Sequence, residues 1–442
     1  MSVPPMPNCT APKNVFPGFS RRKIELNFDG GDITGDAGLL LLRQVDNHLG
    51  LLSRIAPLLP DDRDPELIEH STLNLLRQRV YEIVQGHEDL NDHQRRRDDP
   101  ALQTALSRCE AAASAPTLCR FEHRATAKLT WPVQGEFVRQ FIASHKTPPQ
   151  ELILDFDATD VPIHGNQEER FFHGYYDNYC YLPLYVFCGD QLLVAYLRPS
   201  KIDAAKHAGA ILKWLAQQLR AAWPEVRILF RGDSGFCRRR ILHWCERNRV
   251  DYVVGLAKNS RLNRMAADWL KKAEQDFART GEKQRIFGHF EYAAGTWNHP
   301  RKVIAKAEHT AQGSNPRYIL TTLSGDPQEL YDRLYCARGE MENRIKECQL
   351  GLFATRLSSH QFHINQFRLL LASMAYILLE RLRTVGLAST ELARAQAETL
   401  RSKLLKAGAV IIRNTRRIRF FVASSFVHRE EFLLVASRFA SG

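Results

Sequence analysis

The sequence predicts a mixed α/β fold with helical regions at both ends of the chain. Between residues 151 and 257, runs rich in apolar and β-branched residues alternate with helical patterns in the order β-β-β-α-β-α-β. A doubly wound fold would follow each strand with a helix, so this order favours a mixed sheet. Apolar residues recur at helical spacing from about residue 34 to 108, and residues 363–386 form a long, apolar-rich helix.

The elements of the central segment follow one another closely. Strands are expected over 151–159, 175–189, 192–197, 226–233 and 252–257, and helices over 204–223 and 238–248. This order matches a ribonuclease H-like arrangement, in which acidic residues stand on the first and fourth strands and on a later helix. Those three places therefore carry the candidate functional residues.

Three acids occupy these places. Asp157 ends the first strand, Asp233 ends the fourth, and Glu342 lies in a helical segment further along the chain. Mg²⁺ prefers oxygen ligands of this kind, and two such cations can stabilise both the attacking and the leaving oxygen of an in-line displacement. The pattern indicates metal-dependent cutting and joining of a phosphodiester, with Mg²⁺ or else Mn²⁺ as the cofactor.

Neighbouring acids leave alternatives open. Asp155 shares a strand face with Asp157, whereas Asp160 stands beyond the strand end. We favour Asp157, which lies at the strand end, and keep Asp155 as the runner-up. Glu340 competes with Glu342 only weakly, because it lies off the polar face of its helix.

The helix expected over 335–349 has an apolar and a polar face. The apolar face carries Leu334, Ala337, Met341, Ile345 and Cys348, and the polar face carries Tyr335, Arg338, Glu342 and Lys346. If the apolar face packs on the sheet, Glu342 can reach the two aspartates while Arg338 and Tyr335 contact a phosphate. Taken alone, the segment is better explained as an ordinary amphipathic helix with an Arg338–Glu342 ion pair, and the two strand-end aspartates upstream reverse that preference.

Composition limits the class of protein. The 442 residues include 61 Lys and Arg against 49 Asp and Glu, a net charge of +12 that favours a polyanionic partner. Nine cysteines without a Cys-x-x-Cys pair indicate reduced thiols. The first 19 residues lack the apolar core of a signal peptide, and Leu369–Leu379 is too short to span a membrane. We expect a cytoplasmic protein in which that stretch is a buried helix.

The motifs resemble those of DDE transposases of bacterial insertion sequences, in the IS-four-like group and its IS-thirteen-eighty branch. The matching residues are Asp157-Ala-Thr159, Gly232-Asp233-Ser-Gly-Phe236, Tyr335, Arg338 and Glu342. Gln349 stands where the family helix signature ends in Lys, and Lys346, one turn earlier, is the candidate to supply that charge. The resemblance covers nearly the whole chain.

The resemblance implies a transposase that cuts and joins DNA at the terminal inverted repeats of its element. Asp157, Asp233 and Glu342 would be the catalytic and metal-binding residues, and a homodimer would form on double-stranded DNA. A catalytically inactive DNA-binding protein descended from a transposase is the alternative. A third hypothesis, a host nuclease or resolvase with this core, does not explain the helical N-terminal domain.

The expected segments follow from these assignments. They are a helical, DNA-binding N-terminal domain (1–150) that opens with a loose arm, the first part of the core (151–259), a β-rich insertion (260–325), the catalytic helix and completion of the core (326–386), and a basic, helical C-terminal region (387–442).

Further residues are candidates for DNA contact. Together with the helix residues, the candidates are Tyr335, Arg338, Lys346, Trp297, Lys258, Arg95, Arg96 and Arg97. Trp297 could stack on a flipped base, although a packed aromatic is slightly favoured. For the arginine triplet a solvated turn is equally compatible, as it is for Arg413, Arg416, Arg417 and Arg419 in the tail. His164 and His173 lack the partners of a zinc site.

Overall fold

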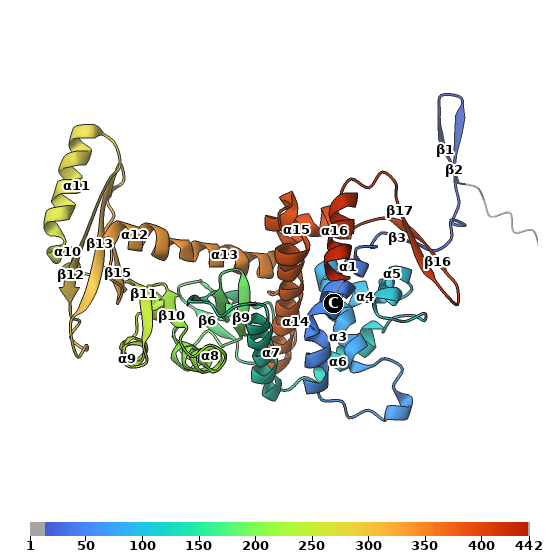
Figure 1. The fold of residues 1–442 in the computed structure, drawn as a ribbon, viewed down its shortest axis with the longest axis horizontal. Coiled ribbons are helices and arrows are strands. Elements are labelled where there is room, and N and C mark those ends of the chain that lie inside the picture. Colours follow the sequence, from blue (N-terminus) through green and yellow to red (C-terminus); the bar gives the residue numbers. More distant parts are fainter. Residues whose placement is uncertain (1–13, 441–442) are drawn as a thin grey trace, which may run out of the picture.

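A computed structural model describes residues 14–440 of the chain (Figure 1). The molecule is elongated. A large sheet with its helices lies toward one end, and helices from both the N-terminal and C-terminal parts of the chain form the other end. The segment that carries Glu342 runs along the sheet toward that helical end, so it connects the two.

The main sheet in the described part of the chain has nine strands. Its five central strands, in spatial order, are β9 (Gln191–Tyr196), β8 (Leu184–Cys188), β4 (Glu151–Ala158), β10 (Arg227–Gly232) and β11 (Val250–Leu256). β4, β10 and β11 are parallel, whereas β8 is antiparallel to both of its neighbours. The predicted mixed sheet is therefore present. The strand expected over 175–189 is interrupted, and its first part forms β7 (Asn178–Tyr181) in a small separate sheet.

The alternation of side chains along β4 separates a core face from a functional face. Leu152, Leu154 and Phe156 are buried in the core beneath α8 (Ala208–Ala222) and α9 (Arg239–Arg247). Because side chains alternate along a strand, Asp155 and Asp157 point to the opposite face. That face packs against the segment that leads to Glu342, through Tyr331 and Tyr335.

The predicted insertion extends the same sheet. Beyond β11 come β15 (Arg317–Thr321), β13 (Arg301–Thr310) and β12 (Gln284–Tyr292), as the sequence predicted. The segment begins, however, with two helices that were not predicted, α10 (Ser260–Met265) and α11 (Ala267–Thr280).

The sequence does carry a signal for α11, because Trp269, Leu270, Ala273 and Phe277 recur at helical spacing among charged residues. Ala273 is buried, and Trp269 lies flat against Phe290 of β12 at a ring distance of 6.1 Å. Gly288 makes this contact possible, since a Cβ at that position would lie 2.2 Å from the Trp269 ring. A glycine in mid-strand is thus the mark of the helix that packs over it.

Helices from the two ends of the chain share one core, as the helical spacing predicted. α1 (Leu39–Leu49) and α3 (Thr72–Gln85) pack with α14 (Phe362–Arg381), and their apolar residues belong to one buried cluster. Ser71 caps α3 by accepting a hydrogen bond from the Asn74 amide. One helical stretch, Phe362–Gly386, is long and apolar enough to cross a membrane, but 83% of its most apolar window is buried inside the protein.

Both ends of the chain contain strands where helix or irregular structure was expected. The prediction of a loose N-terminal arm is wrong for residues 14–20. There β1 (Asn14–Phe19) pairs with β2 (Arg22–Leu26) in a hairpin that projects from the body (Figure 1). Residues 1–13 lie outside the described part. The C-terminal region is helical only in part, because β16 (Ala409–Arg413) and β17 (Ile418–Val422) pair as a hairpin.

Packing against the N-terminal part explains the C-terminal hairpin. β16 also pairs with β3 (Ile33–Thr34), which brings the two ends of the chain into one small sheet. Along β16, Ala409 and Ile411 are buried while Val410 and Ile412 are exposed, the period of two that a strand requires. A helix would have placed those two buried residues on different faces.

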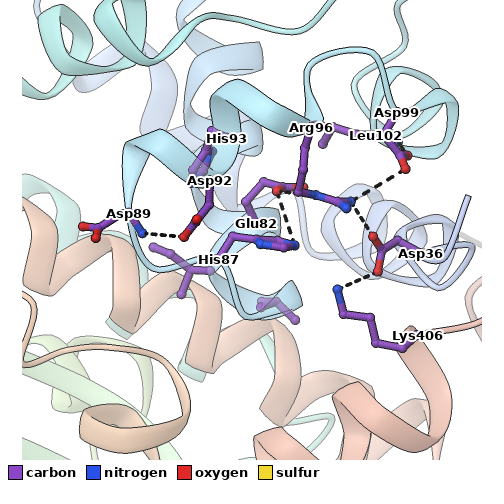
Figure 2. Close-up of polar contacts among 12 residues, drawn as sticks. Asp36, Glu82, His87, Asp89, Asp92, His93, Arg96, Asp99, Leu102 and Lys406 are labelled. Carbon is purple, nitrogen blue, oxygen red and sulfur yellow. Dashed lines mark hydrogen bonds and ion pairs between the residues drawn. The ribbon is translucent and has the colours of Figure 1, made fainter.

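A buried ion-pair network holds the N-terminal helices to the C-terminal region (Figure 2). Arg96, at the end of α4 (Leu90–Arg96), lies 2.8 Å from Glu82 and 2.5 Å from Asp36. Lys406 approaches the same Asp36 at 2.8 Å. Burial raises the pKa of Glu82 to about 7, and the positive charge of Arg96 opposes that rise. Arg96 therefore supports the fold, and this network competes with the DNA contact that the sequence predicted for it.

Replacement of Arg96 by alanine should lower the free energy of unfolding by about 3–5 kcal/mol, because Glu82 and Asp36 would lose a shared partner inside the protein. Arg95→Ala removes the exposed neighbouring arginine and serves as the control, with an expected change within about 0.5 kcal/mol. Urea unfolding measures both. Equal stability of the two variants would contradict a structural role for Arg96.

Candidate active site

The segment that carries Glu342 is one helical run whose winding changes three times. It starts as a π-helix (Leu330–Tyr335), continues as a short 3₁₀ turn (Cys336–Arg338), becomes α13 (Gly339–Lys346) and ends as a second π-helix (Glu347–Gly351). Figure 1 shows this run above the sheet, leading away from α12 (Pro327–Glu329). A single α-helical wheel, as used on the sequence, therefore holds only within α13. Even so, Met341, Ile345 and Cys348 are buried as expected.

The three predicted acids approach one another around one guanidinium. Arg338 lies 2.7 Å from Glu342 and 3.7 Å from Asp157, each measured between a guanidinium nitrogen and a carboxylate oxygen. Asp233 follows β10, where its carboxylate accepts a hydrogen bond from the Gly235 amide at 2.8 Å. Because β4 and β10 are parallel neighbours with Phe156 opposite Gly232, Asp157 and Asp233 emerge at the same edge of the sheet.

The pKa values of Asp157 and Arg338 reflect the charges of the neighbouring acids. The pKa of Asp157 is raised from 3.8 to about 7, first by burial and then by the negative charges of Asp233 and Glu342. Arg338 opposes the rise, and the pKa of Arg338 itself is raised by Asp157, Glu342, Tyr335 and Asp233 against the effect of burial. The site therefore holds more negative charge than its arginine neutralises.

The donor set fits a hard divalent cation. Asp157, Asp233 and Glu342 offer carboxylate oxygens, the ligands that Mg²⁺ and Mn²⁺ prefer, and their mutual repulsion is what a cation would relieve. Within residues 14–440, however, no three His, Cys, Asp or Glu side chains already stand in a metal-binding arrangement. Arg338 lies between two of the acids instead, and no zinc cluster forms around His164 and His173.

The alternative acids have other partners. Asp155 is buried and binds Arg231 through both carboxylate oxygens, one at 2.7 Å. Arg231 also donates to the Leu334 carbonyl at 2.5 Å. This bond ties β4 and β10 to the helical run of residues 330–351, which carries Glu342 and is called the catalytic segment below. Glu340 is exposed and lines a different cavity, with Asp190 and Arg344. This geometry supports Asp157 and Glu342 over their competitors.

Gln349, the departure from the family signature, has a contact that the sequence did not reveal. Its side-chain amide donates to the Asp160 carbonyl at 3.2 Å and lies 3.5 Å from the Thr159 hydroxyl. Lys346 is exposed on α13. Gln349 therefore fastens the end of the catalytic segment to the loop after β4.

Tyr335 and Lys258 line a cavity beside Asp233. The cavity measures ≈ 300 Å³ and also includes Ser234, Arg317 and Tyr331. Gly255 allows Tyr335 to come this close, since a Cβ there would lie 2.7 Å from the tyrosine hydroxyl. Arg317 adds a second cation at this place. It begins β15, and only the folding of β15 beside β11 brings it to the site.

Trp297 lies away from the acids. It stands in the turn between β12 and β13 and packs against the core on the face of the sheet that α8 and α9 cover, whereas Asp157 points to the other face. Its ring packs on Tyr292 at 5.6 Å, and the Arg301 guanidinium lies 5.0 Å from the ring centroid. These contacts agree with the packed aromatic that the sequence slightly favoured, and stacking of Trp297 on a flipped base stays a prediction.

The remaining arginine candidates differ in their surroundings. Arg95 is exposed, whereas Arg97 donates to the Ala112 carbonyl at 2.8 Å. Arg413 donates to the Gln103 side chain at 2.7 Å. The other tail arginines are exposed on the β16–β17 hairpin, namely Arg416, Arg417 and Arg419.

In metal-free buffer, Asp157→Asn should stabilise the protein more at pH 8 than at pH 4. The folded state raises the pKa of Asp157 from 3.8 to about 7, so the aspartate favours folding below the lower value and loses that advantage as pH rises through the upper one. The full difference is about 4 kcal/mol. Thermal or urea unfolding of both proteins across this range measures it. A stability difference that stays constant between the two pH values would show that Asp157 is not buried among like charges.

Comparisons with known proteins give the family of this chain. Among solved structures, the piggyBac transposase in a synaptic complex with hairpin DNA is similar at 11% sequence identity and a TM-score of 0.43, over 83% of this chain and 78% of that chain. A search of curated proteins found no match. The model of the family described as transposase DDE domain group 1 matches residues 16–441. The chain therefore belongs to this family of DDE transposases.

Proposed function

We propose that the protein is an active transposase that cleaves DNA at the ends of an insertion sequence and joins those ends to target DNA, with Mg²⁺ or Mn²⁺ as cofactor. The observation that carries the proposal is the gathering of Asp157, Asp233 and Glu342 around Arg338. The strand order β9-β8-β4-β10-β11 supports it, because numbering the core strands along the chain gives 3-2-1-4-5, the ribonuclease H-like order.

The three carboxylates would hold the divalent cations, which supply charge neutralisation to the attacking and leaving oxygens. The chain's own residues would bind and orient the phosphodiester. Arg338 can turn its two guanidinium nitrogens from the acids to phosphate oxygens, a bidentate contact that suits its planar fork. Tyr335 can donate from its hydroxyl, and Lys258 adds positive charge from the cavity beside Asp233.

The partners follow from the same proposal. Double-stranded DNA is the substrate, both as inverted repeats and as target, and the helical N-terminal part is the candidate reader of the repeats. A homodimer on DNA would bring two ends together, in the cytoplasm where the DNA lies. Within the family, the Asp-x-Thr and Tyr-Arg-Glu motifs are those of the IS-four-like group and its IS-thirteen-eighty branch. An inactive DNA-binding descendant remains the competing function.

The test is metal-dependent cleavage of a labelled duplex that carries the element's end. Asp157→Asn, Asp233→Asn and Glu342→Gln should each reduce cleavage on the order of a thousandfold or more, because each removes a charge from the reacting centre, while DNA binding is kept. Glu340→Gln removes the same charge from an exposed position of the same helix and should cleave like the unmodified protein.

Two outcomes would contradict the proposal. Binding of the end duplex without cleavage, in Mg²⁺ or Mn²⁺, would favour the inactive DNA-binding protein. Cleavage that survives Asp157→Asn but is lost in Asp155→Asn, with both variants folded, would move the first catalytic acid to Asp155.

A further inference from the structure

The largest of the described cavities lies outside the active site. It measures ≈ 870 Å³ and lies between the beginnings of α8 and α9. Its lining is strongly basic, and the basic side chains are Lys206, His207, Arg238, Arg239, Arg240 and His243. Asp203 is the acid among the lining residues, and it is already paired with Arg238 at 2.6 Å. The cavity therefore carries an excess of positive charge.

The loop that presents Lys206 and His207 is held in place from within. Arg198 is fully buried and donates to the carbonyls of Ala204 at 2.9 Å and Lys206 at 2.6 Å. Its second terminal nitrogen is buried without a hydrogen-bond partner in the described structure, so part of this charge is not satisfied by the protein. Such a buried, incompletely paired guanidinium adds to the positive potential behind the loop.

The backbone at the cavity is also constrained. His207 has φ +70°, a left-handed conformation that is unusual for a histidine. It stands at the start of α8, and the tyrosine ring of Tyr196 packs on it at 5.5 Å. The backbone of the loop is thus held where it presents Lys206 and His207, and constrained backbone of this kind recurs at binding sites.

The position of this cavity relates it to the active site. α9 begins shortly after Asp233, through the single turn Ser234–Phe236, so both lie at the carboxyl edge of the sheet. The catalytic segment covers one face of the sheet, and α8 and α9 cover the other (Figure 1). A DNA strand that crosses this edge can therefore contact the carboxylates on one side and the basic cavity on the other.

From these observations we infer that the basic cavity between α8 and α9 binds the phosphodiester backbone of DNA next to the reacting phosphate. The inference rests on the proposed transposase function. Three exposed arginines at the start of α9 and an exposed lysine in the loop before α8 suit a run of phosphates, whereas a small anion would use only a few of them. The bound duplex is either the element's end or the target, and the two can be told apart by experiment.

The test compares two double variants of the full-length protein. Arg239→Gln with Arg240→Gln removes two charges from the cavity. Lys213→Gln with Arg247→Gln removes two charges from exposed positions of the same helices that do not line it. The dissociation constant for DNA is measured against salt concentration. The cavity variant should bind about tenfold or more weakly at 0.15 M salt, and its salt dependence should fall by about one unit of slope per arginine.

Separate activity measurements identify the bound duplex. If the cavity holds the element's end, binding and cleavage of the end duplex both fall in the cavity variant. If it holds target DNA, end cleavage is unchanged, and joining of pre-cleaved ends to a target plasmid falls instead.

A cavity variant that matches the control in salt dependence and in both activities would overturn the inference and leave the proposed function standing. Failure of the unmodified protein to cleave any duplex would instead count against the proposed function, while a lower salt dependence of DNA binding in the cavity variant would still support the cavity as a DNA site.

Discussion

Repulsion among three carboxylates is the constraint on which the rest of the site depends. Asp157 lies with Asp233 and Glu342 in a partly buried place, and its pKa is raised first by burial and then by the charges of these two acids. Arg338 neutralises part of the charge by contacting two of the acids. Carboxylates that repel one another separate unless the surrounding structure prevents it. Contacts between the sheet and the catalytic segment on both sides of Glu342 oppose this separation.

Two contacts hold the catalytic segment on the sheet. They use Asp155, which was a candidate catalytic acid, and Gln349, which has no obvious role in sequence. Before Glu342, Arg231 joins Asp155 of β4 to the backbone at Leu334. After it, Gln349 joins the loop that follows β4. Between these points the helix changes its winding from π to 3₁₀ to α and back to π. Local π-helical turns are often found at functional sites, and here they lie directly outside the stretch that carries Arg338 and Glu342.

The predictable features of this protein are those whose cause is local. Asp157 and Asp233 could be placed because each ends a continuous apolar strand, and parallel neighbouring strands bring their ends to one edge. The part that could not be predicted depends on partners distant in sequence. The partners of Arg96 are 14 and 60 residues away, at Glu82 and Asp36. From sequence alone, an arginine in an exposed charge cluster therefore cannot be told from one in a buried ion-pair network. The β16–β17 hairpin likewise depends on pairing with β3, at the other end of the chain.

The same reasoning limits what net charge can say about a partner. A charge of +12 favours a polyanion but cannot say where it binds. In the folded protein, some cations are neutralised internally, as Arg96 and Arg231 are by the buried carboxylates of Glu82 and Asp155. Others are presented without equivalent acids, as in the cavity between α8 and α9. Only the second kind can attract DNA, because the field of the first is cancelled by its neighbours. The unpaired positive charge lies at the carboxyl edge of the sheet, where the carboxylates also lie. Its position is therefore more informative about DNA binding than the net charge of the chain.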